Sequence, residues 1–330
     1  MSEYTIAVRP GSPVATLAQA LSLLPPDDGT PAVIHLAPGT YREKAVISRA
    51  RTTIEGAGAG QTRIVWDDAA RTILPDGRKR GTFRTATLRT DAPGITLRGL
   101  TIENAAAPRE AAGQAIALYA DGDGLLVEDC TLLGAQDTLF TAPLPPKEIE
   151  KDGFIGPKQH APRVPQRQLY RRCRIAGDVD FIFGGAAAWF EDCELISIDG
   201  RADRSSPCPG FVCAPSTPEG QRFGYVFSHC RFTADGAAAG SVYLARPWRE
   251  WARVMLVCCE LGAHIAPAGF DDWNKPLSHR TALFAEYGSF GPGAQGPRAA
   301  FARQLGRDEA GRITLERFLS SMDDIGQSTP

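Results

Sequence analysis

The sequence predicts an all-β fold, a parallel β-helix in which short strands wind into stacked coils. The first indication is a phrase that recurs along the chain: an apolar residue, two variable residues, a cysteine, one more residue and a second apolar residue. The second is its spacing, because successive copies lie 20 to 43 residues apart, which suits single coils with or without an extra loop. The clearest copies are VEDCTL, YRRCRI, FEDCEL, FSHCRF and LVCCEL, which contain Cys130, Cys173, Cys193, Cys230 and Cys259.

The third indication is what separates the phrases. From about residue 63 to 262, short β-branched or aromatic runs alternate with Gly, Pro and Asp turns, and no long helical pattern lies between them. This argues against a doubly wound α/β sheet or a barrel with alternating helices. A β-sandwich is the alternative, but it would not explain small residues at one fixed position of each repeat.

The cysteine position itself predicts free thiols stacked in the core. An earlier copy, IENAAA, is aligned with Ala105 at that position, so the position holds either Cys or Ala. Small apolar side chains and cysteine are among the most buried types. Cys208 and Cys213 fall in a Pro/Gly loop without zinc-ligand spacing, and we expect them to be free as well.

The ends of the chain predict caps on the coils. A strand is expected at residues 4–8, followed by a helix that opens at Ser12-Pro13 and ends at Pro25-Pro26. An amphipathic helix ahead of a repeating β array is a natural lid. Strands follow at 32–37, 45–48 and 52–56, and an amphipathic helix is expected near 315–322. Val14, Leu17, Ala18 and Leu21 form the expected apolar face of the first helix. With no linker in sight, residues 1–330 are expected to form one domain.

Composition limits the partners. Lys and Arg number 36 and Asp and Glu 38, for a net charge of -2, so nucleic acid is not an expected partner. No apolar run is long enough to cross a bilayer, and no membrane partner is expected. The N-terminus lacks the pattern of a signal peptide, so a cytoplasmic location is expected, or a secreted one if a leader was removed.

Two acidic motifs follow the repeated phrase at equal spacing. In GAQDTLF, Asp137 lies seven residues after Cys130, and in GDVDFIFGGA, Asp180 lies seven residues after Cys173. Neighbouring parallel strands are about 4.8 Å apart, so the two carboxylates should face one another. When two carboxyls are held close together, the pKa of one rises while that of the other stays low. The pair then supplies one acid and one nucleophile or base.

Three more residues complete the expected chemistry. Arg246 in YLARPW can hold a carboxylate in a fixed fork, and we expect it to keep Asp180 ionised. Gln136 and Gln114 carry amide donors suited to an oxyanion. No GxSxG nucleophile motif occurs and the five histidines form no metal-spaced cluster, so hydrolysis by carboxylates, without metal or cofactor, is expected.

On these motifs the chain resembles the pectin methylesterases, or pectinesterases. The resemblance covers most of the chain, and it is carried by GTYREK, TFRTAT, QAIAL, GAQDTLF, RQLYRRCRIAGDVDFIFGGA, YLARPWREWARV and FAEYG. It implies a right-handed parallel β-helix that hydrolyses methyl esters of galacturonate in pectin or oligogalacturonides, with no metal.

The resemblance also implies roles for single residues. Asp180 would be the nucleophile and Asp137 the general acid and then base. Gln136 would stabilise the oxyanion with help from Gln114, and Arg246 would orient Asp180 and meet the substrate. Contacts to the substrate are implied for two further residues, a stacking contact for Trp248 and a contact for Thr82.

Several positions depart from the family pattern. Asp178 replaces a usual threonine and should share a strand face with Asp180, so a third carboxylate would alter the pH dependence. Residues 141–167, with six prolines, form an insertion expected beside the site. One hypothesis is that this loop narrows the cleft and restricts the enzyme to short oligogalacturonide esters; the alternative is a disordered surface insertion.

Other functions and roles stay open. A polygalacturonate-cleaving glycoside hydrolase would also use paired acids, and a non-catalytic carbohydrate-binding solenoid would keep the aromatic residues. Trp251, Trp273 and Tyr41 are interpreted as structural.

Overall fold

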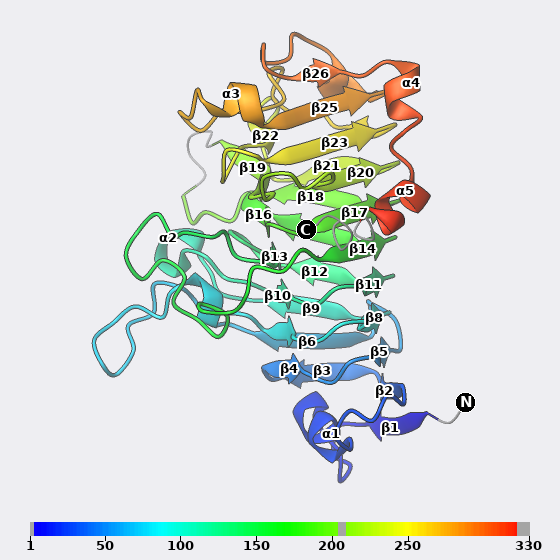
Figure 1. Ribbon diagram of the computed structural model, residues 1–330. Helices are drawn as coiled ribbons and strands as arrows, with labels where there is room; N and C mark the ends of the chain where they lie inside the picture. The colour runs from blue at the N-terminus through cyan, green and yellow to red at the C-terminus, as the bar shows by residue number, and fades with distance from the viewer. Residues whose placement is uncertain (1–2, 204–208, 322–330) are drawn as a thin grey trace.

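A computed structural model describes residues 3–203 and 209–321, and it shows a parallel β-helix (Figure 1). The chain passes in turn through three sheets, which run side by side along most of the stack, and every pairing between named strands is parallel, as in β11 with β14. The predicted fold class is confirmed.

The three sheets share the coils between them, each coil giving one strand to each sheet through most of the stack. The eleven-stranded sheet contains β1 (Tyr4–Val8), β2 (Ala32–Leu36), β5 (Thr52–Gly56), β8 (Thr96–Arg98), β11 (Leu125–Glu128), β14 (Arg167–Arg171), β17 (Ala187–Glu191), β20 (Tyr225–Ser228), β23 (Arg253–Val257), β25 (Leu283–Tyr287) and β26 (Arg303–Gln304). The eight-stranded sheet contains β3 (Gly39–Arg42), β6 (Thr62–Trp66), β9 (Thr101–Asn104), β12 (Thr131–Leu133), β15 (Arg174–Gly177), β18 (Glu194–Ile198), β21 (Arg231–Asp235) and β24 (Glu260–Leu261). The seven-stranded sheet contains β4 (Ala45–Ile47), β7 (Leu88–Thr90), β10 (Leu118–Ala120), β13 (Leu139–Thr141), β16 (Val179–Gly184), β19 (Gly210–Pro215) and β22 (Val242–Ala245).

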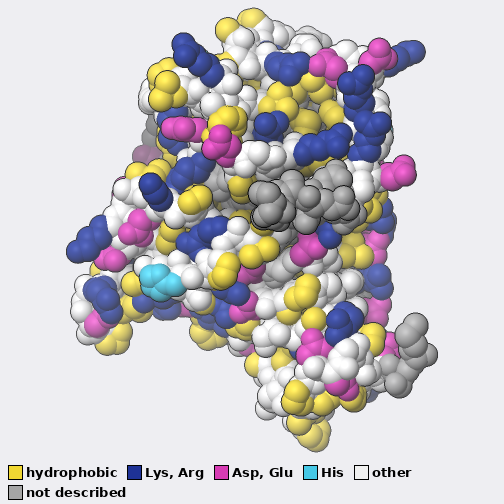
Figure 2. All heavy atoms as spheres, viewed as in Figure 1, with side chains coloured by type: hydrophobic (Ala, Val, Ile, Leu, Met, Phe, Trp, Pro, Cys, Tyr) yellow, Lys and Arg dark blue, Asp and Glu magenta, His cyan; other side chains and the backbone are white. Residues whose placement is uncertain are grey.

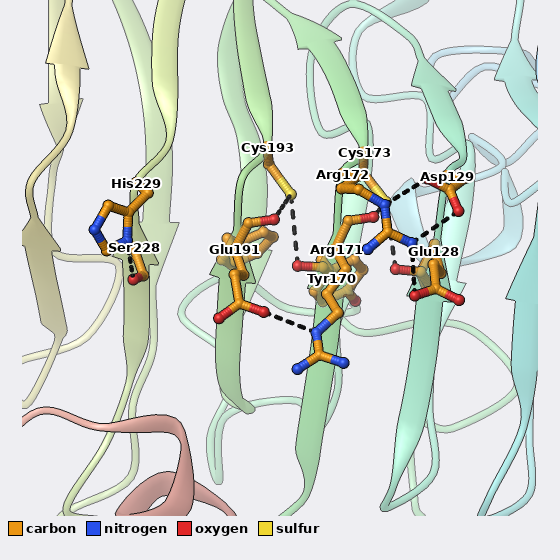
Figure 3. Close-up of polar contacts among 12 residues, drawn as sticks. Glu128, Asp129, Tyr170, Arg171, Arg172, Cys173, Glu191, Cys193, Ser228 and His229 are labelled. Atoms are coloured by element: carbon orange, nitrogen blue, oxygen red, sulfur yellow. Dashed lines mark hydrogen bonds and ion pairs between the residues drawn. The ribbon is translucent and has the colours of Figure 1, made fainter.

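The repeated phrase turns the chain from the eleven-stranded sheet into the eight-stranded one. The residue before each cysteine has a positive φ, as at Asp129 (52°), Arg172 (49°) and Asp192 (54°). One residue in this left-handed region makes the corner sharp. The cysteine that follows points inward, and Cys193 Sγ donates to Tyr170 O at 3.5 Å (Figure 3).

The cysteines are free and stacked, as predicted. Burial raises the pKa of Cys130 to about 12, so this thiol stays protonated. The alignment of Ala105 with this position is wrong, since Thr101 pairs with Thr131 and Leu100 therefore occupies the position. Leu100 follows Gly99, which has the positive φ of the corner, whereas Ala105 is exposed. Cys213 is buried in β19 rather than in a loop, and Cys208 lies outside the described residues.

The inside of the stack is filled by side chains that repeat from coil to coil. Tyr170, Phe190 and Phe227 occupy one register position of neighbouring strands, and their rings stack at 4.7 Å. Outside, Arg172 bonds to Asp129 and Glu128 across the same coils (Figure 3). The exposed surface mixes both charges (Figure 2), as the near-neutral composition predicts.

Helix α1 (Leu17–Leu23) covers the N-terminal end of the coils (Figure 1), but it starts later than predicted. Thr16 caps it, because its side chain accepts from Gln19 N while the Gln19 side chain accepts from Thr16 N. Ser12 instead bonds within a turn that precedes the helix. The buried face is Leu17 and Ala20, so the expected place of Ala18 in that face is wrong.

The remaining helices lie along the sides of the stack and at its C-terminal end. Helix α5 is confirmed as a C-terminal helix, and it packs on the side of the stack, where Phe318 meets Trp189 at 5.5 Å. None of the helices in residues 3–203 and 209–321 is long and apolar enough to cross a bilayer. The expected cytoplasmic location stays a prediction. The others are α2 (Arg109–Ala112), α3 (Ser278–Thr281), α4 (Arg307–Ala310), α5 (Leu315–Ser320) and two 3₁₀ turns, Thr82–Arg84 and Pro292–Ala294.

Candidate active site

Asp137 and Asp180 occupy matching positions on neighbouring coils of the seven-stranded sheet. Leu139 in β13 pairs with Ile182 in β16, and each aspartate lies two residues earlier. Asp137 N donates to Val179 O at 3.1 Å, which fixes the two backbones side by side. The equal spacing from the cysteines therefore brings these two residues together.

Both aspartates are strained and buried. Asp137 has φ 67° and Asp180 φ 49°, and they are 7% and 6% exposed. Such backbone conformations persist where the surroundings impose them, and they concentrate at functional sites. The chain reaches Asp180 through Gly177, where a side chain would meet Phe181 Cβ at 2.2 Å, so the approach to β16 requires glycine.

Arg246 binds Asp180 through a two-pronged ion pair. Its Nε donates to Oδ1 at 2.8 Å and its Nη2 to Oδ2 at 2.7 Å. The arginine follows β22 and is held by its own backbone N, which donates to Cys213 O at 3.0 Å. Two rings stack on the guanidinium, Phe211 and Trp273, each with its centroid 3.8 Å from Cζ. This packing leaves the fork little freedom to turn away.

The two carboxyls are electrostatically different. Burial raises the pKa of Asp137 well above its usual value, and the neighbouring Asp180 charge raises it further. Burial also raises the pKa of Asp180, but there the Arg246 guanidinium acts in the opposite direction. The pair therefore holds its proton on Asp137 and its negative charge on Asp180.

Gln136 directly precedes Asp137, and Gln114 lies on the coil before it. Ala115 N donates to Gln136 O at 3.0 Å, which joins the two segments. Both glutamines are half-buried, and neither side-chain amide bonds to another of the described residues. Their N–H groups are therefore available to a bound molecule.

Asp178 forms the single-residue corner between β15 and β16. It is 5% exposed, and Arg109 Nε lies 3.3 Å from its Oδ2. Burial raises the pKa of Asp178, and its charge in turn contributes to the raised pKa of Asp137. The third carboxyl expected from the sequence thus acts on Asp137.

Trp248 packs in an aromatic cluster on the outside of the seven-stranded sheet. Its ring meets Phe183 edge-on at 5.7 Å and Phe154, from the inserted loop, at 6.2 Å. The Arg249 guanidinium lies over the same ring at 4.7 Å. Trp248 is only partly exposed, and stacking on a sugar stays a prediction.

The inserted loop leaves β13 after Thr141 and returns at β14. The ring of its Phe154 packs against the ring of Phe83, with the two centroids 5.9 Å apart. Phe83 directly follows Thr82 in the first 3₁₀ turn. Arg249 Nη2 donates to Lys147 O at 3.0 Å, and Lys158 forms ion pairs with Asp91 and Asp121. These contacts favour an ordered loop over a disordered insertion. Whether Thr82 touches a substrate stays a prediction.

Sequence reasoning missed three residues around Arg246. Phe211 had no recognised motif, and Trp273 was interpreted as structural although it stacks on Arg246. Lys275 Nζ donates to Pro247 O at 2.7 Å and to Trp248 O at 3.2 Å. The segment GFDDWNK, residues 269–275, carries a signal, because its Trp273 lies two residues before Lys275 and an indole ring can cover a nearby cation. No group of three potential metal-binding side chains occurs in the part of the chain that the structure describes.

The fold and this arrangement define a class: solenoid enzymes with two carboxyls on one sheet. The pectinesterase family model matches residues 4–144 and 162–322, and the chain belongs to that family. The match leaves out residues 145–161, most of the inserted loop. Relatives include pectinesterase 31 of Arabidopsis thaliana, 30% identical over 94% of this chain and 89% of that protein. Pectinesterase QRT1 of the same plant is also 30% identical, over 94% of this chain and 75% of its own.

Solved structures of pectin methylesterases have the same fold as this chain. The pectin methylesterase PemA from Erwinia chrysanthemi has a TM-score of 0.78 at 27% identity, covering 97% of each chain. Carrot pectin methylesterase has a TM-score of 0.78 at 25% identity, over 100% of this chain and 97% of that one. Pectinesterases are carboxylic ester hydrolases, and this chain, as a member of the family, is a carboxylic ester hydrolase.

Proposed function

We propose that this protein hydrolyses methyl esters of galacturonate in pectin or oligogalacturonides by a two-aspartate covalent mechanism. The observation that carries the proposal is the buried Asp180, held by the Arg246 fork beside Asp137, whose pKa burial raises well above its usual value. One acid is thereby prepared as nucleophile and the other as proton donor.

The reaction follows from these two states. A carboxylate oxygen of Asp180 attacks the ester carbonyl carbon, and the negative oxygen that forms accepts hydrogen bonds from Gln136 and Gln114. Asp137 gives its proton to the methoxy oxygen as the carbon–oxygen bond breaks, and methanol leaves. Asp137, now ionised, takes a proton from water, which attacks the same carbonyl and releases Asp180. Every proton and charge is carried by side chains of this chain, so the proposal needs no metal or cofactor.

The substrate class follows from the family and its structures. One solved pectin methylesterase, 27% identical to this chain, is in complex with a hexasaccharide. For this chain we propose methyl-esterified pectin or oligogalacturonide as substrate, with Trp248 stacking on a sugar ring, Thr82 in contact with it, and Arg246 touching it as well as Asp180.

Chain length is a finer part of the proposal. Through Phe154 the inserted loop reaches Trp248 and Phe83, the neighbour of Thr82, so it borders both residues for which a substrate contact is proposed. We propose that it narrows the cleft and favours short oligogalacturonide esters. Equal kcat/KM per ester on long pectin and on short oligomers would contradict this part alone.

The test is methanol release from methylated pectin by the wild-type protein, Asp180→Asn and a matched control, Asp192→Asn. Asp192 is also an aspartate at positive φ. It is exposed, and it lies at the corner between the eleven-stranded and eight-stranded sheets rather than on the seven-stranded sheet that carries Asp180. We expect Asp180→Asn to lose at least about a thousand-fold in kcat and Asp192→Asn to keep its activity. Shortened chains without methanol would instead identify a glycoside hydrolase, and binding without turnover a carbohydrate-binding solenoid.

A further inference from the structure

The turn at residues 271–275 is held in a conformation that its own sequence does not favour. Trp273 and Asn274 both have positive φ, 52° and 54°. Two aspartates brace it, since Trp273 N donates to Asp271 Oδ1 at 2.7 Å and Asn274 N to Asp272 Oδ1 at 2.9 Å. Two consecutive non-glycine residues in this region are strained, and such strain persists only where the surroundings impose it.

What the turn holds is the segment that carries Arg246. The Trp273 ring stacks on the guanidinium at 3.8 Å. Lys275 reaches the backbone of the same segment, and its Nζ donates to the carbonyls of Pro247 and Trp248. The Lys275 ammonium also lies 4.2 Å from the centroid of the Trp273 ring. One turn thus holds the side chain of Arg246 and the backbone that follows it.

We propose that Lys275 is a positioning residue, whose positive charge fixes the Arg246–Trp248 segment and so keeps the Arg246 fork on Asp180. This inference rests on the proposed function, because its effect is on the nucleophile. Lys275 acts through Arg246 and needs no contact with the substrate. A neutral amine makes weaker bonds to the two carbonyls than an ammonium does.

The surroundings set the pH at which this charge is lost. Burial lowers the pKa of Lys275 to about 8, and the charges of Arg249 and Arg246 act in the same direction. Asp180 and Glu250 act against them. The other acidic groups of the turn are Asp271, which accepts from Trp273 N, and Asp272, which lies 3.0 Å from His279 Nε2 of α3. Lys275 is therefore charged at neutral pH and loses its proton a little above it.

The experiment compares methanol release by the wild type, Lys275→Arg and Lys275→Met from about pH 6 to 9, with an enzyme-free blank at each pH. Arginine stays charged throughout this range, and methionine never carries a charge. The exposed Lys79→Met serves as control. Thermal unfolding of each variant shows whether it is folded.

We expect wild-type kcat to fall above about pH 8, Lys275→Arg to keep its rate there, and Lys275→Met to be roughly ten-fold slower at pH 7 with no fall near 8. KM should change little. An alkaline fall in Lys275→Met or Lys275→Arg identical to that of the wild type would overturn the proposal. If Lys275→Met does not fold, the Lys275→Arg profile decides. A wild type without methanol release would instead contradict the proposed function.

Discussion

Replacing Arg246 by lysine keeps the positive charge but removes the fork, which makes it the sharpest test of the site. The arginine makes two charge-assisted bonds to Asp180, at 2.8 and 2.7 Å, and stacks on two rings. A lysine can keep one bond, so the loss is one bond of about 1.5–3 kcal/mol and roughly 1 kcal/mol of stacking. If this loss falls on the transition state, kcat/KM drops by about 60-fold to 900-fold.

The pH dependence of the activity gives a second, independent test of the role of Arg246. Arg246 lowers the pKa of Asp180 against the effect of burial, so Arg246→Met should raise that pKa. The nucleophile is then protonated over a wider range, and the activity ratio of wild type to Arg246→Met should grow as the pH falls.

The assay is initial-rate methanol release on methylated pectin between about pH 5 and 8. Arg249→Lys is the matched control, because Arg249 is the neighbouring half-buried arginine and its hydrogen bonds go to backbone carbonyls. The reasoning fails if Arg246→Lys keeps more than about a third of wild-type kcat/KM, or if the Arg246→Met ratio is the same at every pH.

Three further outcomes follow from the structure. Asp137→Asn should abolish turnover yet raise the unfolding midpoint at pH 7 by roughly 2 °C or more, because an acid whose pKa is raised by folding destabilises the fold increasingly as pH rises above about 4. An unchanged or lower midpoint would contradict the raised pKa of Asp137. Asp178→Asn should lower the pKa of Asp137, which a ¹³C NMR titration of the aspartate carboxyls would show, and no shift would mean that the Asp178 charge does not reach it. Phe154→Ala should raise kcat/KM on long pectin relative to short oligomers by about ten-fold at a stability cost of roughly 3 kcal/mol, with Ile149→Ala as the exposed control from the same loop; an unchanged ratio would separate the loop from chain-length selection.

The sequence predicted the parts of the molecule that depend on local repeats. The placing of Asp137 beside Asp180 came from counting residues after a cysteine, and this count works because each cysteine follows a positive-φ corner and lies directly before a strand of fixed register. The same logic failed at Ala105, where the corner is Gly99 and the inward residue is Leu100. A sequence repeat defined by its cysteine misses a coil in which glycine forms the positive-φ corner and leucine takes the inward position of the cysteine.

The surroundings of Arg246 could not be predicted in this way. Phe211 in β19 is far along the chain from the turn that carries Trp273 and Lys275, and these residues meet around Arg246 only because coils stack. Their approach depends on loop conformations, including two strained residues in one turn, which no periodicity encodes. A tryptophan is also ambiguous by itself, since it packs in cores as readily as it covers a cation.

The two carboxyls are separated by 43 positions of sequence, and most of that stretch is the insertion between β13 and β14. Their spacing in space is nevertheless set by the hydrogen-bonded rungs between adjacent turns of the solenoid, not by the polypeptide that joins them. Evolution can therefore lengthen, shorten or redecorate this connection while the reactive centre keeps its dimensions, so that substrate choice and bond-breaking chemistry are free to diverge separately.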